Sequence, residues 1–275
     1  MIRNRAKIYS MIIAAFIIAA LPEFSMAEVV AKLTFMRGDV DVLKLGAERA
    51  ILLNLGDGLN TGDILRTKSK SRAQLTFTDG TKLNIAQKSR IEIKAFDIDT
   101  ARNKRTVLLR SFRGKFRAIV PEEFAGEGSR FEVETPTAVA IVRGTDWLNI
   151  INPLPLSTEE MVLRGSVAVR NVKPGIAGEV ILGPMMGTSV PANRPPTPPR
   201  RVRLEELIPH LRDTSPVKDD QHLSPEELGV PRGGPQIISE PGFAVPPVSP
   251  PVTDTYPEIL EPEPPVEEPP LESPV

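Results

Sequence analysis

Alternation of apolar and polar residues is the sequence feature that most constrains the fold of this chain. Between residues 28 and 190 helical periodicity is nearly absent, whereas period-two alternation recurs, for example in 74–78, 90–94 and 130–134. Successive side chains of a strand point to opposite faces, so this pattern is typical of half-buried strands. Asp79-Gly80 lies between two alternating runs and indicates a hairpin. Short strands with turn signals about every ten residues predict an all-β sandwich, roll or barrel.

A short phrase made of arginine and glycine recurs between apolar segments. It is found at Arg37-Gly38, Arg113-Gly114 and Arg164-Gly165, with a looser copy at Arg143-Gly144. The spacing between copies is unequal, which excludes a repeat of fixed period. We interpret the phrases as equivalent tight corners in a sheet that folds over itself, because glycine adopts backbone conformations that are closed to other residues.

The amino-terminal residues have the pattern of a secretory signal peptide. Three basic residues precede an apolar run over 8–21, and Ser25-Met26-Ala27 follows. This order predicts cleavage after Ala27 and a place in the periplasm or at the cell surface. The alternative is an uncleaved anchor, but the run is shorter than the ~20 apolar residues of a spanning helix. The chain has no cysteine, so we expect an ordinary apolar core without disulfides.

Proline content divides the chain near residue 190. Of the 29 prolines, 22 lie from Pro191 onward. This change predicts one folded domain over 28–190 and a largely disordered, proline-rich tail over 191–275. Two stretches of the tail, 201–212 and 224–229, have helical signals. Short docking helices are one interpretation, but we favour transient helices, because isolated helices of this length are marginal in water.

Several classes of activity are excluded by residues that the predicted domain lacks. His210 and His222 both lie in the predicted tail, so residues 28–190 contain neither histidine nor cysteine. Nucleophilic Ser-His and Cys-His pairs and the usual zinc sites are therefore excluded there. The net charge of −1 and the 5% of aromatic residues give no indication of nucleic-acid binding. We predict a protein that is not an enzyme and that has no cofactor.

Paired carboxylates are the remaining candidates for chemistry or cation binding. The pairs are Asp97 with Asp99, Glu122 with Glu123, and Glu132 with Glu134. A calcium site needs six or more oxygen ligands, so we expect solvated side chains and no metal site at the first pair. We place the third pair on the wet face of a half-buried strand. No catalytic residue is predicted.

The segment 135–147 is the most informative stretch of the sequence. Its middle, 138–142, is apolar without alternation, which is typical of a strand covered on both faces. It begins with Thr135-Pro136-Thr137 and ends with Arg143-Gly144-Thr145-Asp146-Trp147. This stretch resembles the signature of the FecR family, bacterial envelope proteins with a periplasmic all-β domain.

The resemblance to the FecR family covers about residues 32–190 and rests on the order of several motifs. Besides the signature they are Gly38-Asp39-Val40, the run 56–67, Ser71-Arg72-Ala73-Gln74-Leu75, Asp79-Gly80-Thr81-Lys82-Leu83 and 164–169. The resemblance implies a jelly-roll or β-solenoid-like domain in the periplasm. Members that regulate iron uptake carry a cytoplasmic segment that acts on a sigma factor. Only seven residues precede the apolar run here, so we expect no such segment.

Two interpretations of the signature remain open. In the first, Arg143, Thr145 and Asp146 form a recognition corner for a partner. In the second, which we favour, Arg143 pairs inside the fold with a carboxylate such as that of Asp146. The other signature residues are expected to have structural roles; they are Thr135, Pro136, Thr137, Gly144 and Trp147.

The function predicted from the sequence is that of a non-enzymatic binding module for an envelope protein, acting in signalling or assembly. It would not be an integral membrane protein once the signal peptide is removed. The alternative is a structural or surface-attachment protein that binds peptidoglycan or another glycan. The low aromatic content weighs against that alternative, because sugar rings usually stack on aromatic faces.

Overall fold

The computed structural model describes residues 28–122 and 128–217, which belong to one compact unit. The predicted signal peptide, Glu123, His222 and the helical signal at 224–229 lie outside the described residues. The described part consists almost entirely of strands, which confirms the predicted all-β class. The strands and the helix are β1 (Val29–Arg37), β2 (Val40–Leu43), β3 (Ile51–Leu52), β4 (Gly58–Asn60), β5 (Ile64–Thr67), β6 (Arg72–Phe77), β7 (Lys82–Ile85), β8 (Arg90–Asp99), β9 (Lys104–Ile119), β10 (Arg130–Glu134), β11 (Ala138–Pro153), β12 (Leu156–Asn171), β13 (Glu179–Leu182), β14 (Met186–Pro191), β15 (Arg200–Arg201) and α2 (Leu204–Asp213).

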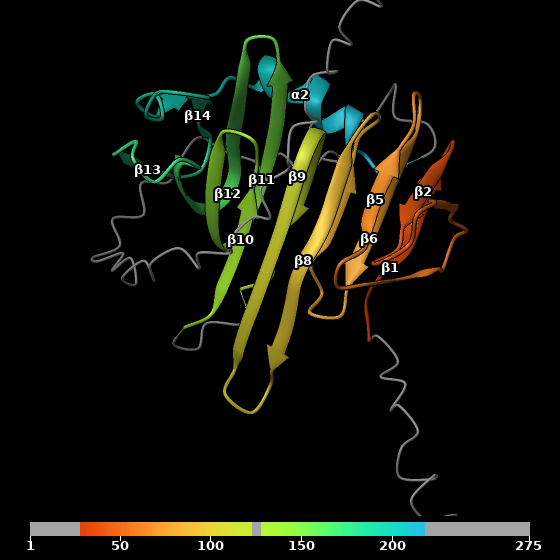
Figure 1. The fold of residues 1–275 in the computed structure, drawn as a ribbon. Coiled ribbons are helices and arrows are strands. Elements are labelled where there is room, and N and C mark those ends of the chain that lie inside the picture. Colours follow the sequence, from red (N-terminus) through yellow and green to blue (C-terminus); the bar gives the residue numbers. More distant parts are fainter. Residues whose placement is uncertain (1–27, 123–127, 218–275) are drawn as a thin grey trace, which may run out of the picture. The chain divides into compact units, whose positions relative to one another are not determined.

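Hydrogen bonds join all the strands into one mixed sheet that folds over itself. Three long strands, β9, β11 and β12, make this possible, because each changes neighbours along its length. The first part of β9 pairs with β8 and β10, and its last part pairs with β7 and β11. The strands follow one another across the sheet broadly in chain order, from β1 to β14 (Figure 1).

Aromatic side chains pack between the two layers that the folded sheet creates. The ring of Phe77 on β6 stacks on that of Phe96 on β8, with 5.5 Å between centroids. Trp147 on β11 is fully buried and meets the ring of Phe131 on β10 edge-on, at 6.1 Å. Such pairs contribute ~0.5–1.5 kcal/mol beyond the area that they bury. They fix the two layers against each other.

The glycines of the Arg-Gly phrases form the corners where the chain passes between the layers. Gly38, Gly114, Gly144 and Gly165 all have left-handed backbones, with φ of 70°, 96°, 56° and 84°. A Cβ on Gly114 would lie 2.6 Å from the Cα of Ser89, and one on Gly165 would lie 2.4 Å from the carbonyl oxygen of Gly144. Only glycine fits such close backbone approaches. The corners predicted from the phrase are therefore present.

These corners lie at two opposite ends of the strands; we call the two rows of strand ends the corner edges of the folded sheet. Where β9 and β11 run side by side, Gly114 pairs with Ile151 at one end and Ile119 pairs with Asp146 at the other. The corner at Gly114 is thus separated from the corner at Gly144 by the length of the paired segment of β9 and β11. The folded chain has one edge built from the corners at Gly38 and Gly114 and another built from those at Gly144 and Gly165.

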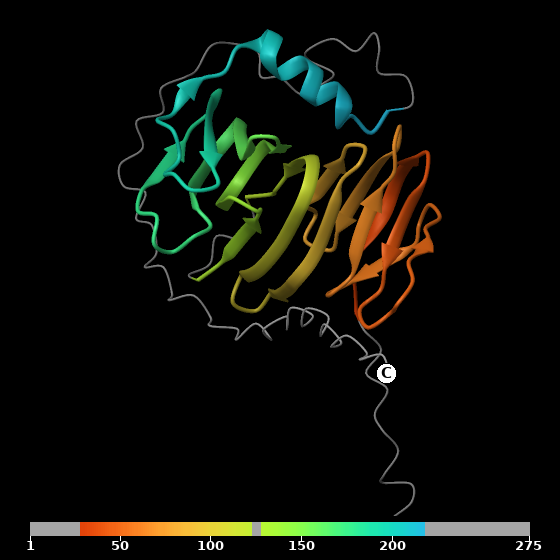
Figure 2. The same ribbon diagram turned by 45° about the horizontal axis from the view of Figure 1, so that its top comes forward.

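The packed part of the chain continues past residue 190, where proline content placed the end of the domain. β15 pairs with β14, and α2 buries Leu207 and Leu211 against a cluster that includes Leu148, Met161 and Leu163. Figure 2 shows α2 along one edge of the sheet. A short helix that is marginal in isolation is stabilised here by burial of its apolar face, although Pro209 lies inside it. The transient helix expected at 201–212 is therefore a docked helix.

Shortening a buried leucine of α2 tests how much this docking stabilises the fold. Leu211→Ala is expected to lower the free energy of unfolding by about 2–3 kcal/mol, because it leaves a cavity in a small apolar cluster. Urea unfolding of the whole chain measures the change. Leu154→Ala is the matched control, since Leu154 is 92% exposed and its loss should leave the midpoint unchanged. Equal midpoints for both variants would contradict a stabilising role of α2.

Candidate functional site

The first part of the signature forms a buried turn. The Oγ1 atom of Thr135 accepts a hydrogen bond from the backbone N–H of Ala138 at 2.8 Å. Thr135 and Thr137 each contact the hydroxyl of Thr158 on β12, at 2.8 and 2.7 Å. All three threonines are buried. Their polar groups bond within the protein, so this half of the signature serves the fold.

The three residues considered as a recognition corner lie in the second part of the signature, and their environments differ. Thr145 is fully buried, and its hydroxyl lies 2.8 Å from the backbone oxygen of Ser166. Asp146 is buried and receives two hydrogen bonds of 2.7 Å from the guanidinium of Arg117 on β9. Arg143 is exposed and pairs with no carboxylate in residues 28–122 and 128–217.

Arg143 therefore does not pair with Asp146, which was our example of a carboxylate partner inside the fold. The register of β11 shifts between Arg143 and Asp146 and again before Trp147, so simple alternation does not predict which face each side chain takes. Asp146 turns toward Arg117, and only Arg143 of the three candidates is accessible to a partner.

Arg143→Ala is expected to change the free energy of unfolding by less than about 0.5 kcal/mol, as usual for an exposed side chain without a structural contact. Thermal unfolding of the two proteins, monitored by circular dichroism, provides the measurement. A loss several times larger would show that Arg143 supports the fold, and it would remove this residue from the accessible candidates.

Three of the carboxylates considered for chemistry, Asp99, Glu132 and Glu134, lie in separate ion pairs. Asp99 contacts Arg102 at 3.2 Å, and Glu134 contacts Arg110 at 2.9 Å. Glu132 pairs with Arg130 and is only 4% exposed. Its predicted place on a wet face is therefore wrong, because this face of β10 is buried. The described ranges contain no group of three potential metal ligands close enough to hold an ion.

A polar cavity of about 260 Å³ lies beside the corner at Gly38. We call it the corner pocket; its lining residues are Arg37, Lys70, Ser71, Arg72, Gln87 and Asp213. Successive turns stack to form it. The backbone N–H of Asp39 donates to the Oγ of Ser71 at 2.9 Å, and that of Lys70 donates to the Oε1 of Gln87 at 2.7 Å. The turns that stack beside the corner at Gly38 thus form the pocket.

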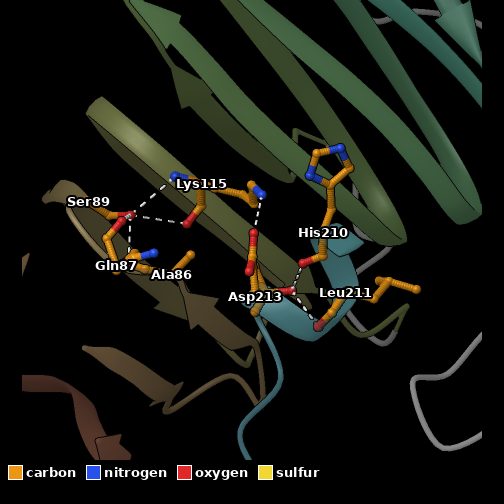
Figure 3. A network of polar contacts seen from close by, with 8 residues as sticks. Ala86, Gln87, Ser89, Lys115, His210, Leu211 and Asp213 are labelled. Carbon is orange, nitrogen blue, oxygen red and sulfur yellow. Dashed lines mark hydrogen bonds and ion pairs between the residues drawn. The ribbon is translucent and has the colours of Figure 1, made fainter. Parts of the chain in front are cut away.

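The carboxyl-terminal end of α2 forms one wall of the corner pocket. Figure 3 shows Asp213 turned toward Lys115 of β9, with 2.6 Å between the carboxylate and the ammonium group. His210, one turn earlier, is half-buried, and burial together with the positive charge of Lys115 lowers its pKa. Asp213 and Lys115 thus form an ion pair at this wall of the corner pocket.

A second exposed feature is apolar and lies on the outermost strand of one layer. Four side chains between residues 45 and 55 are largely exposed, and we call them the apolar edge: Leu45 (77%), Ile51 (54%), Leu52 (69%) and Leu55 (65%). Ile51 and Leu52 form β3, which pairs with β2 and, in the described part of the chain, with no other strand. One side of β3 therefore has unpaired backbone groups.

Comparison with known proteins identifies the domain that contains these features. Residues 63–168 match the family described as FecR protein. This match confirms the resemblance to the FecR family over that range. It includes the signature, the long strands β9 and β11, and four of the six residues that line the corner pocket. The apolar edge and α2 lie outside the matched range.

Two solved structures resemble part of the chain that holds the FecR domain. They are crystal structures, at 2.50 and 1.65 Å resolution, of a proposed anti-sigma factor from Parabacteroides distasonis ATCC 8503. Both are 18% identical to this chain and cover 52% of it, with TM-scores of 0.42 and 0.41. The match spans 62% of that protein. No curated protein matches the sequence. Within residues 28–122 and 128–217, no helix is long and apolar enough to cross a membrane.

Proposed function

We propose that the chain is an exported, non-enzymatic binding module that holds a protein partner in the bacterial envelope, as part of signalling or assembly. The observation that carries the proposal is the apolar edge. Leu45, Ile51, Leu52 and Leu55 are each largely exposed, on β3 or in the turns on either side of it. Contiguous exposed apolar side chains are typical of surfaces that bind another protein.

The geometry of the apolar edge favours recognition by strand addition. A strand at the edge of a sheet presents unpaired N–H and C=O groups, to which an extended segment of another protein can add. Ile51 and Leu52 are adjacent, so their side chains point to opposite faces of β3. A partner strand beside β3 would cover both. Main-chain hydrogen bonds would supply affinity, and the two side chains would supply specificity.

Export and the lack of catalysis are supported by the sequence and by the family. The residues before Glu28 have the order of a signal peptide, and FecR domains are typical of the periplasm. Thr135, Thr137 and Asp146 of the signature bond within the fold. Of the carboxylates considered for chemistry, Asp99, Glu132 and Glu134 lie in ion pairs. Arg143, exposed at the other edge of the sheet, is a further candidate contact.

Capture from envelope extract tests the proposal. Protein 28–275 is immobilised and cross-linked to bound proteins, in parallel with Leu52→Glu and with the control Leu154→Glu. Leu52→Glu is expected to reduce capture of the partner by at least about thirtyfold, because a charge at the centre of an apolar contact costs ~2 kcal/mol or more. Leu154 is more exposed than Leu52, so its substitution controls for the added charge.

The outcomes distinguish binding of an envelope protein from attachment to the cell wall. Equal capture by both variants would remove the apolar edge as the contact. Sedimentation with purified peptidoglycan, without capture of any protein, would instead favour a structural protein that attaches to the cell wall. Turnover of an envelope substrate by the purified chain would overturn the non-enzymatic part of the proposal.

A further inference from the structure

The docked helix α2 has a titratable side chain beside the face that meets the sheet. His210 lies one turn after Leu207 and next to Leu211, and both leucines are fully buried in the apolar cluster beneath the helix. Residues three and four positions apart share one side of a helix, so His210 lies at the border of this buried face. It is half-buried, and its Nδ1 atom is buried with no hydrogen-bond partner among the described residues. Docking of α2 therefore takes this nitrogen out of water without replacing its hydrogen bond.

Charged groups on β9, on β12 and on α2 itself act on His210. Lys115 of β9 lies beside the helix (Figure 3), and its positive charge disfavours a second positive charge on the imidazole. From β11 and from the chain before the helix, α2 meets uncharged side chains, which are Leu148, Ile150 and Val202. The carboxylates that favour a charged imidazole are Glu159, Glu206 and Asp213.

Each of these three carboxylates also has another partner. The partners are Lys115 for Asp213 at 2.6 Å, Arg200 for Glu206 at 2.9 Å and Asn152 for Glu159 at 2.8 Å. Their attraction for His210 is therefore shared with other groups. Burial, together with the charge of Lys115, outweighs it and lowers the pKa of His210. The docked position of α2 thus disfavours protonation of its own histidine.

We infer that α2 is a pH-sensitive docking helix, which protonation of His210 releases from the sheet. In the released helix His210 meets water, and its pKa returns to about 6.5. The released helix then binds a proton that the docked helix does not bind, so release becomes more frequent as the pH falls below about 6.5. Arg200 holds the pKa of Glu206 below its ordinary 4.5, so that carboxylate stays charged over this interval. Release uncovers the apolar cluster that contains Leu148 and Met161.

The helix can leave the sheet while the strands stay paired. α2 docks through Leu207, Leu211 and the ion pair of Asp213 with Lys115, whereas backbone hydrogen bonds join the strands. β15, which precedes the helix, is held by its pairing with β14. Arg203 is the extended N-cap residue and makes no side-chain cap hydrogen bond, so the helix can turn about it. An element held by few side-chain contacts opens at lower free energy than core strands, so the release is local.

Thiol labelling of the full chain tests the inference, because the sequence has no cysteine of its own. Leu207→Cys places a single thiol beneath α2, and Val133→Cys, in a second protein, places one in the main core. Each labelling rate is divided by the rate in the urea-unfolded protein at the same pH, so the ratio reports how often the site opens. From pH 7.5 to pH 5.5 the ratio at position 207 is expected to rise about three- to tenfold, and that at position 133 should not rise.

Substitution of each histidine in the Leu207→Cys protein shows whether His210 is the group that titrates. His210→Gln cannot gain a charge, and glutamine is a good helix former, so the ratio should be equal at both pH values. His222→Gln is the matched control, the same change at the other histidine of the chain, and it should keep the rise. A ratio that does not rise, or that rises equally in His210→Gln, overturns the inference. A parallel rise at position 133 also overturns it, because acid would then unfold the whole sheet.

Discussion

Glu160→Gln is expected to prevent the free energy of unfolding from falling as the pH rises from about 4.5 to about 8. In the unchanged protein this free energy should fall over the same interval. Burial raises the pKa of the Glu160 carboxyl from 4.5 to about 8. In that interval the folded protein holds a proton that the unfolded chain releases, so the free energy of unfolding falls with rising pH and levels off above it. The full effect is on the order of 5 kcal/mol.

The surroundings of Glu160 explain the raised pKa. The side chain is fully buried, and burial disfavours the charged form. The side-chain amide of Asn149 donates to its Oε1 at 2.6 Å, and Trp147 lies close by without a hydrogen bond. Both contacts favour the ionised carboxylate but do not outweigh burial. Among the described residues, Oε2 of Glu160 and Oδ1 of Asn149 have no partner. A protonated carboxyl supplies the donor that this pair lacks, and so does the amide of glutamine.

Urea unfolding across the pH range gives the measurement for this prediction. The difference in unfolding free energy between Glu160→Gln and the unchanged protein should be small in acid and grow steadily toward pH 8. Glu179→Gln on β13 is the control, because Glu179 is exposed, and its profile should follow that of the unchanged protein. A difference that stays constant with pH would show that Glu160 does not hold a proton in the folded state.

Asp146→Ala is expected to destabilise the FecR domain by about 3–5 kcal/mol, because it leaves the buried guanidinium of Arg117 without the carboxylate that binds it. Both side chains are about 8% exposed, and the two hydrogen bonds between them measure 2.7 Å. The ion pair itself contributes little net stability, since each charge is costly to bury. The large effect comes from breaking the pair.

A double variant separates these two contributions. Arg117→Met with Asp146→Leu replaces the pair by apolar groups and should recover most of the stability that Asp146→Ala loses. Calorimetric melting of the three proteins gives the comparison. If the double variant is as unstable as the single one, the pair contributes through its geometry, and loss of the carboxylate from the Arg117 guanidinium is not what destabilises Asp146→Ala.

The strands were predictable because alternation is a local property. β6, β7 and β10 coincide with alternating runs, and Asp79-Gly80 connects β6 to β7 as expected. The helix α2 was not predictable from its own sequence, because it is stabilised by contact with Leu148 and Met161, which lie far away in the sequence. Locally, Pro209 and its proline-rich surroundings argued against a helix. Tertiary burial decided the outcome in favour of α2.

The candidate sites were less predictable than the fold. The corner pocket collects side chains from β1, from β6, from two separate turns and from α2, and no spacing in the sequence brings them together. The apolar edge contains consecutive apolar residues, a pattern that normally predicts burial. The bulges around Gly144 decided that Arg143 is exposed and Asp146 is buried. Such irregularities of register are invisible to a count of alternating positions.

The three strands that pass through both layers, β9, β11 and β12, affect how this protein unfolds. In a sandwich of separate sheets, one sheet can loosen while the other persists. Here the same backbone forms the middle of both layers through β9, β11 and β12. Loss of pairing in one layer removes the support of the other, so unfolding is a single cooperative event for this part of the chain. A partner bound at either edge thereby stabilises the whole sheet.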